Sequence, residues 1–439
     1  MFSKRLFISL ILLCGFLSLS QAQQTISLEE LLSKALANNM GLQQQALQAD
    51  IEQLDAEKSN AVFLPRVNAS YSFGRTNDPL NVFGTKLKQK IIQQADFAPD
   101  LLNNPDGMNS YNALVKVEQP IFNLDGIYMR SAARAKALAS KHQLAYGKEY
   151  LTFQVKQLFA QLQLLYAAND VLEKAKKTVE ANVNLVENLS KQGYTKPSDE
   201  LEVNVRLTDM ENKILNNKIN IQNLSDQLYY IMGQDAKETL KPTTEIKEIP
   251  STVGLLPQSN LETERDDLLA YRAGIDAQKN MLKASRSKFS PRVNAFGQYE
   301  INNHKLFQGD ADNYMVGMRL SWNLFNGTQN IKDIQKNKVA LEKAEVAYED
   351  YLTKSQAELN KAHRDVENAL AKIALAEKAL NQAKESYRIR KNRFEEGLEK
   401  TTDLLKDDSA VEEKHLNYLQ ELFQLKVAVY YIEFLTSTK

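Results

Sequence analysis

Hydrophobic and polar residues alternate in four short stretches of this chain, which long stretches of helical period separate. Alternation at every second position is typical of a strand with one apolar and one polar face. The predicted strands lie near residues 66–74, 110–121, 292–302 and 314–324. Each is about as long as the 9 to 11 residues that a tilted strand needs to cross a bilayer. The pattern therefore favours strands that lie between lipid and water.

The alternation also assigns side chains to faces. In the second strand Val115 lies on the apolar face and Lys116 on the polar face, and in the fourth Leu320 and Arg319 divide in the same way. We expect the apolar face to contact lipid. The charged residues expected to face a water-filled lumen are Lys116, Glu118, Glu300 and Arg319. An ordinary soluble sandwich would also have amphipathic strands, but it would not need the long helices described next.

Two of the helical stretches are unusually long. One runs from about 124 to 191, with Gly126 and Gly147 as its interruptions, and the other from about 330 to 396 without Gly or Pro. Sixty-odd residues at about 1.5 Å rise make a rod of roughly 100 Å. Apolar residues in the second rod recur at steps of three, four and seven, as in a coiled-coil seam. Most of its Glu and Lys residues then form a solvated face, and we assign them no function.

The chain also contains two copies of one helix-to-strand plan. FLPRVNA at 63–69 returns as FSPRVNA at 289–295, with proline where the helical period changes to alternation. The domains expected from this duplication are a first repeat at 23–233, an equatorial linker at 234–259 that holds three prolines, and a second repeat at 260–439. Residues 74–110 exceed their counterpart in length. We expect a solvated extracellular loop there, with binding or plugging as the alternative.

The N-terminus predicts export. Residues 1–22 have basic Lys4 and Arg5, an apolar core and small residues up to Ala22, which is the plan of a cleaved signal peptide. Cys14 does not suit lipidation, because Leu13 stands where a small residue is needed. With that cysteine removed, the mature chain has neither disulfides nor thiolates.

Composition and motifs argue against an enzyme or a nucleic-acid-binding protein. Lys+Arg and Asp+Glu both number 55, so no net charge attracts nucleic acid. The four histidines are scattered, without the spacing of metal ligands. The HRD triplet at 363–365 lies within a helix, and Leu370 stands where a kinase needs Asn. We expect no catalytic site, metal or cofactor.

Four strands cannot close a barrel, since single-chain bacterial barrels begin at about eight strands. Open sheet edges are not tolerated in lipid. If the strands lie in a membrane, several chains must share one barrel. The alternative is an exported coiled-coil scaffold or interaction protein with a small β-hairpin layer and no channel.

The order of the motifs resembles the outer membrane efflux protein (TolC) family over essentially the whole mature chain. The motifs are SLEELLSKALANN, the paired PRVNA junctions, IFN at 121–123, LFN at 324–326, GYTKPSDELE at 193–202 and GLEKTTDLLKDD at 397–408. The resemblance implies an α+β membrane protein and a homotrimer. Each chain would give four strands to a twelve-stranded outer-membrane β-barrel, continued by a periplasmic α-helical barrel. It implies an exit duct of a tripartite efflux or type I secretion system, with a periplasmic adaptor and an inner-membrane pump as partners.

The same resemblance assigns roles to two turns, 192–200 and 396–403, at the periplasmic tips. Residues implied in adaptor docking are Gly193, Ser198, Asp199, Gly397, Thr401 and Thr402. Residues implied in the periplasmic gate are Asp403, Lys406, Asp407 and, as a latch, Phe394. Lys406 stands where the family often has an acid, so the constriction is either acidic or mixed in charge. Alternatively, Ser198, Thr401 and Thr402 only cap helices.

Overall fold

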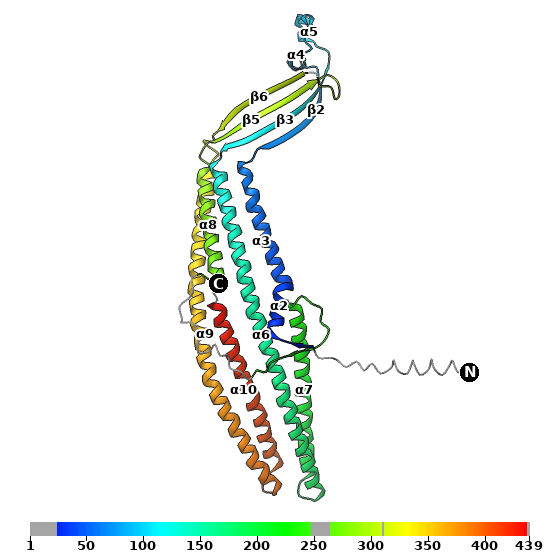
Figure 1. Cartoon of the computed structure of the whole chain (residues 1–439), viewed down its shortest axis with the longest axis vertical. Helices are drawn as coiled ribbons and strands as arrows, with labels where there is room; N and C mark the ends of the chain where they lie inside the picture. Colours follow the sequence, from blue (N-terminus) through cyan, green and yellow to red (C-terminus); the bar gives the residue numbers. More distant parts are fainter. Residues whose placement is uncertain (1–23, 247–263, 310, 437–439) are drawn as a thin grey trace, which may run out of the picture. The chain divides into compact units, whose positions relative to one another are not determined.

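The computed structural model describes residues 24–246, 264–309 and 311–436. The expected signal peptide and most of the expected linker lie outside these residues. Figure 1 traces the elements in chain order. The helices are α2 (Leu28–Asn38), α3 (Met40–Lys58), α4 (Pro79–Lys88), α5 (Pro99–Asn103), α6 (Leu124–Lys191), α7 (Pro197–Ile231), α8 (Asp266–Ser287), α9 (Gln329–Glu395) and α10 (Thr401–Leu435). The strands are β1 (Gln24–Ile26), β2 (Arg66–Thr76), β3 (Met108–Phe122), β4 (Leu240–Pro242), β5 (Arg292–Asn303) and β6 (Ala311–Ser321).

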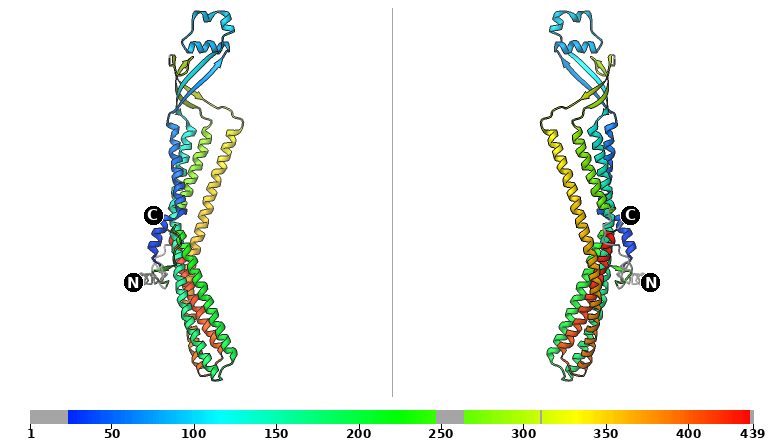
Figure 2. Two further views of the ribbon diagram at one scale, coloured as in Figure 1. Left: turned by 90° about the vertical axis from the view of Figure 1, so that its right-hand side faces the viewer. Right: turned by 90° about the vertical axis from the view of Figure 1, so that its left-hand side faces the viewer.

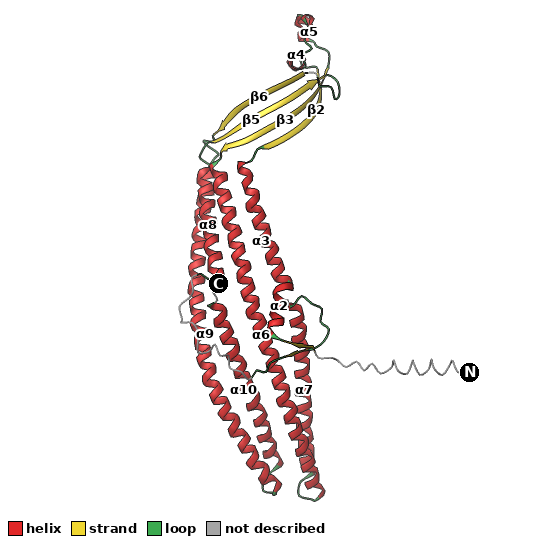
Figure 3. Ribbon diagram, viewed as in Figure 1, coloured by secondary structure: helices red, strands yellow, loops and turns green. Residues whose placement is uncertain are grey.

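The chain divides into two compact units, and each is described by itself. The sheet unit comprises residues 48–142 and 269–349, and it holds a four-stranded antiparallel sheet in the order β2-β3-β5-β6. Figure 3 shows these strands in yellow. All four predicted strands are present, but β6 ends at Ser321, before the predicted limit. The next residue, Trp322, instead donates from its indole N–H to the carbonyl oxygen of Phe289 at 2.9 Å.

Strand register sorts the sheet into two faces. Lys116 of β3 lies opposite Asn68 of β2 and Gln298 of β5, so these polar residues share a face. Val115, one position earlier, lies opposite Ala69 and Tyr299. The alternation in the sequence therefore corresponds to one polar and one apolar face across all four strands.

The helical unit comprises the described residues of 1–47, 143–268 and 350–439. Its cores form where α6, α7, α9 and α10 bury aliphatic residues, including Leu162, Leu228, Leu359 and Leu425 at 0% exposure. Helix α2 begins with Ser27 as its N-cap, whose Oγ accepts the Glu30 N–H at 3.1 Å. Among the described helices, none combines the length and the apolar composition needed to cross a membrane.

The expectation that two glycines interrupt the first long helix needs correction. Helix α6 continues through Gly126 and Gly147, which do not interrupt it. At Gly147 an added Cβ would lie 2.0 Å from Gln45 Oε1, and at Gly126 it would lie 2.4 Å from Val62 Cγ2. Each glycine therefore allows close approach of a neighbouring side chain, at a cost of about 1 kcal/mol in helix propensity.

The two segments expected as a linker and a loop both contain regular secondary structure. The described part of the expected linker contains β4, which pairs in parallel with β1. Residues 74–110 contain α4, a 3-10 turn and α5, with Val82 only 2% exposed and Gln89 only 4%. Most of the segment is nevertheless exposed, so the expectation of a solvated extracellular segment stays a prediction, while its short helices were not predicted from the sequence.

Candidate functional site

The two long helical hairpins end in turns of the same construction. Gly193 and Gly397 have positive φ angles of 80° and 74°, which favour glycine. After each glycine the chain closes the helix with a backbone hydrogen bond, from Tyr194 N–H to Leu189 O and from Leu398 N–H to Arg393 O, both at 2.9 Å. This is a Schellman closure, and it explains glycine at these positions by backbone geometry alone.

The helices after these turns are not capped as the sequence suggested. The N-cap residues are Lys196 and Lys400, and neither makes a side-chain capping hydrogen bond. Ser198, Thr401 and Thr402 lie inside the first turns, so the interpretation of them as N-caps is wrong. Thr401 is buried at 3% exposure, whereas Ser198 and Thr402 are exposed. Exposed residues at a turn remain available to a partner.

Asp199 stabilises the start of its own helix. Its Oδ2 accepts the backbone N–H of Lys196 at 3.1 Å. An acid in the first turn of a helix also interacts favourably with the helix dipole. Asp199 therefore has a structural role beside the docking role that the sequence suggested.

Arg390 of α9 lies among the acidic residues of the second tip. Its Nε donates to Asp407 Oδ2 at 2.9 Å, and its Nη1 lies 3.5 Å from Glu399 Oε2 and 4.0 Å from Asp403 Oδ2. The Asp407 side chain is 14% exposed and that of Asp403 44%. Lys406 is exposed and forms no ion pair with another described residue. Much of the negative charge of this tip is therefore balanced within one chain, by a residue that sequence reasoning did not single out.

Phe394 is part of the core of the tip. It is 2% exposed and packs in a cluster with Val183, Val186, Val203 and Leu404. This cluster joins α6, α7, α9 and α10. Any latch role of Phe394 would thus act through the packing of these helices on one another.

A buried ionic network, which sequence reasoning missed, joins α7 to α10. Arg206 Nη2 lies 3.2 Å from Asp408 Oδ2 and 2.6 Å from Glu412 Oε2, and Lys213 Nζ lies 2.7 Å from Glu412 Oε1. The side chains of Asp408 and Glu412 are only 5% and 2% exposed. Burial raises the pKa of Asp408, and the charge of Arg206 opposes that rise.

The four charged strand residues named from the sequence share the polar face of the sheet. Lys116 Nζ lies 2.5 Å from Glu118 Oε1, and the Arg319 guanidinium lies 5.3 Å from the ring centre of Phe296. Glu300 pairs with Lys88 of α4 at 3.2 Å. Val115 and Leu320 lie on the opposite face and are 44% and 65% exposed.

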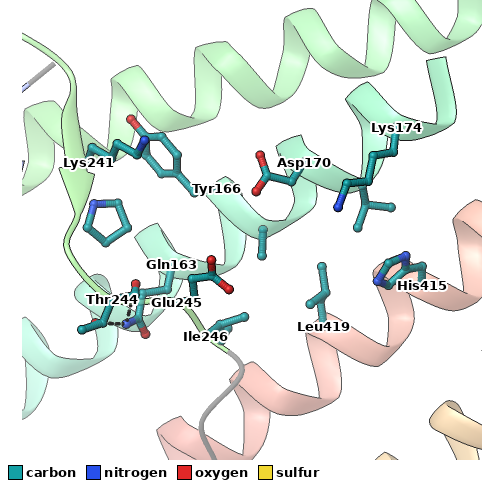
Figure 4. A pocket seen from close by; sticks show the side chains of 13 residues that line it. Gln163, Tyr166, Asp170, Lys174, Lys241, Thr244, Glu245, Ile246, His415 and Leu419 are labelled. Atoms are coloured by element: carbon teal, nitrogen blue, oxygen red, sulfur yellow. Dashed lines mark hydrogen bonds between the residues drawn. The ribbon is translucent and has the colours of Figure 1, made fainter. Parts of the chain in front are cut away.

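The helical unit also contains a cavity of about 430 Å³ between α6, α10 and the segment after β4. Figure 4 shows the ionisable side chains that line it, Asp170, Lys174, Lys241, Glu245 and His415. Gln163 Nε2 closes one end by donating to Thr244 Oγ1 at 2.7 Å. Across the described part of the chain, no three His, Cys, Asp or Glu residues lie so as to hold a metal ion.

Comparison with known proteins agrees with this architecture. The model of the outer membrane efflux protein family matches residues 31–234 and 257–436. The alkaline protease secretion protein AprF of Pseudomonas aeruginosa is 19% identical over 359 residues, which are 80% of this chain and 72% of that protein.

Solved structures share the fold. The outer membrane protein VceC of Vibrio cholerae has a TM-score of 0.76 and 18% identity, and the match covers 92% of this chain and 95% of that one. The CmeC outer membrane channel of Campylobacter jejuni has a TM-score of 0.78 and 16% identity, over 93% and 85% of the two chains. This chain therefore belongs to the outer membrane efflux protein family and is a non-enzymatic transport channel of the outer membrane.

Proposed function

We propose that three copies of this chain form one channel, with a shared twelve-stranded barrel. The observation that carries the proposal is the sheet itself. Both edge strands, β2 and β6, have only one strand partner within the described chain. An edge strand with free backbone N–H and C=O groups is a template for pairing with another chain. Pairing β6 of one copy with β2 of the next would satisfy both edges.

The two faces of the sheet support the proposal that it forms a barrel wall between lipid and water. The apolar face leaves Tyr314, Val316 and Met318 of β6 at 80%, 73% and 69% exposure. Such a wide exposed apolar surface is rare on a soluble monomer. The polar face, with Lys116 and Arg319, would line the lumen. A soluble coiled-coil scaffold gives no reason for this division.

The channel would serve as the exit duct for an inner-membrane pump, reached through a periplasmic adaptor. The long hairpins of α6 with α7 and of α9 with α10 support this role, because their tips offer exposed Ser198 and Thr402 for adaptor docking. The name of the relative AprF refers to secretion of a protease. For this chain, drugs, metal ions and polypeptides all remain candidate cargo.

The gate in this proposal is a constriction of mixed charge at the second tip. Asp403 of each copy would face its symmetry mates, and Arg390 would offset part of the carboxylate charge. Phe394 would hold the helices that carry these residues.

Fractionation and planar-bilayer recording test the proposal. We expect the protein in the outer-membrane fraction, extracted only by detergent, at three times the mass of one chain and with single-channel conductance. Recovery from the soluble periplasm as a non-conducting species would instead support the scaffold alternative.

A further inference from the structure

Residues 79–103, which we call the cap, fold as a unit between β2 and β3. Helix α4 begins with the Asp78 carboxylate accepting the N–H of Asn81 at 2.9 Å. Lys90, at a φ of 58°, closes that helix. Lys86 then pairs with Asp96 at 2.7 Å, which ties α4 to the segment that follows it.

Packing between side chains adds to these polar contacts. The rings of Phe83 and Phe97 meet edge to face, with centres 5.6 Å apart. Val82 is only 2% exposed. The cap is thus an ordered element held by a few contacts, although Phe97 remains 57% exposed.

The cap crosses the end of the sheet. It leaves from the edge strand β2, yet its contacts are with the other strands: Lys88 Nζ lies 3.2 Å from Glu300 Oε1 of β5, and Lys90 Nζ lies 2.9 Å from Asp312 Oδ1 of β6. Gln89 Nε2 donates to the carbonyl oxygen of Asn109 in β3 at 3.2 Å. Figure 1 and Figure 2 show α4 next to the ends of the strands and α5 farther from them. Strands β3, β5 and β6 therefore all hold the cap.

Asp312, the partner of Lys90, lies opposite Ile301 on the apolar face, but two other residues that contact the cap lie on the polar face. Glu300 lies on that face, and so does Asn313, whose Nδ2 donates to the carbonyl oxygen of Lys88 at 3.4 Å. At this junction Gln89 is 4% exposed and the Glu300 side chain 15%, whereas the Lys88 side chain is 58% exposed.

We propose that the cap narrows the outer exit of the channel and limits the size of the solutes that pass it. This inference rests on the proposed function, in which the polar face lines the lumen. Three copies would place three caps at the mouth, each fastened to its own sheet. The Lys88–Glu300 pair holds each cap on the lumen side.

A double-mutant cycle of charge reversals tests whether the Lys88–Glu300 pair holds the cap in place. Lys88→Glu and Glu300→Lys each place like charges together, and we expect each to raise single-channel conductance and to admit large hydrophilic antibiotics into cells. The double variant restores an opposite pair and should return both readouts toward wild type. Lys34→Glu is the matched control, since Lys34 pairs with Glu30 on α2, far along the chain from the cap. Equal conductance of both single variants and wild type would overturn the proposal.

Deletion and cross-linking of the cap test the same proposal by independent measurements. Replacing 79–103 by a Gly-Ser linker should raise conductance and large-solute entry. Lys88→Cys with Glu300→Cys, in a chain whose single cysteine is Cys14, should let a short bis-maleimide fix the cap and keep conductance at or below wild type. If wild type forms no channel, the proposed function fails. If wild type conducts and the deletion conducts equally, only the role of the cap fails.

Discussion

Arg206 offers the sharpest test of how the periplasmic tip is held together. Arg206→Met keeps an unbranched apolar stem and removes the guanidinium charge, which leaves Asp408 without its cation and Glu412 with Lys213 only. Removing one partner of a buried ion pair costs about 3–5 kcal/mol of stability. Because Lys213 remains at 2.7 Å from Glu412, we expect the lower end, about 3 kcal/mol.

Hydrogen exchange of the backbone amides of α7 and α10 measures this loss directly. At about 1.4 kcal/mol for each tenfold change, local opening should become roughly a hundredfold more frequent. Lys218→Met on the same helix is the control, since its pair with Glu173 has side chains 58% and 41% exposed. Such surface pairs contribute about 0–1 kcal/mol. Similar exchange rates in the two variants would refute the stabilising role of the buried network.

The same network has a pH dependence of defined sign. Burial raises the pKa of Asp408 in the folded chain, so the folded state holds this proton more tightly than the unfolded state. The stability contributed by this group is therefore full below the ordinary pKa of Asp and decreases as the pH rises through the raised folded value. Asp408→Asn should remove that decrease from the exchange profile, while the charges of Arg206, Lys213 and Glu412 stay in place. Identical pH profiles for variant and wild type would contradict the assignment.

Five further substitutions test the sheet and the tip. Val115→Arg should cost about 2–4 kcal/mol if it lies near the bilayer midplane, and Lys116→Ala should be tolerated, as measured by the amount of folded channel in outer membranes. Asp403→Ala should weaken cation selectivity and Arg390→Ala should strengthen it, because Arg390 offsets the carboxylates; reversal potentials that do not change in either variant would place the constriction elsewhere. Phe394→Ala should cost about 3–5 kcal/mol and expose the tip to proteases.

The sheet could be predicted from the sequence because its determinants are local. A period of two places Val115 and Lys116 on opposite faces whatever the partner strand is, and the register of β2, β3, β5 and β6 then aligns those faces. The glycines of the tips are local signals as well, since a left-handed residue must close each helix. The cap was missed for the opposite reason. Its helices are short, and contacts with β5 and β6, more than 200 residues away, hold them.

The ionic contacts of the tip show why the internal duplication of the sequence does not identify the residues that pair at the candidate site. Gly193 and Gly397 are equivalent in the two repeats, yet Arg206 of the first repeat binds Asp408 and Glu412 of the second. Comparing the repeats with each other cannot reveal such a pair, because the partners do not occupy equivalent positions. Antiparallel packing of α9 and α10 has the same effect, since it brings Arg390 before the turn next to Asp407 after it. Charged residues that would be assigned to a solvated face from the sequence of one helix therefore form a network only when two helices pack side by side. The net charge of the proposed gate depends on which charged residues this packing pairs, more than on the number of acidic residues.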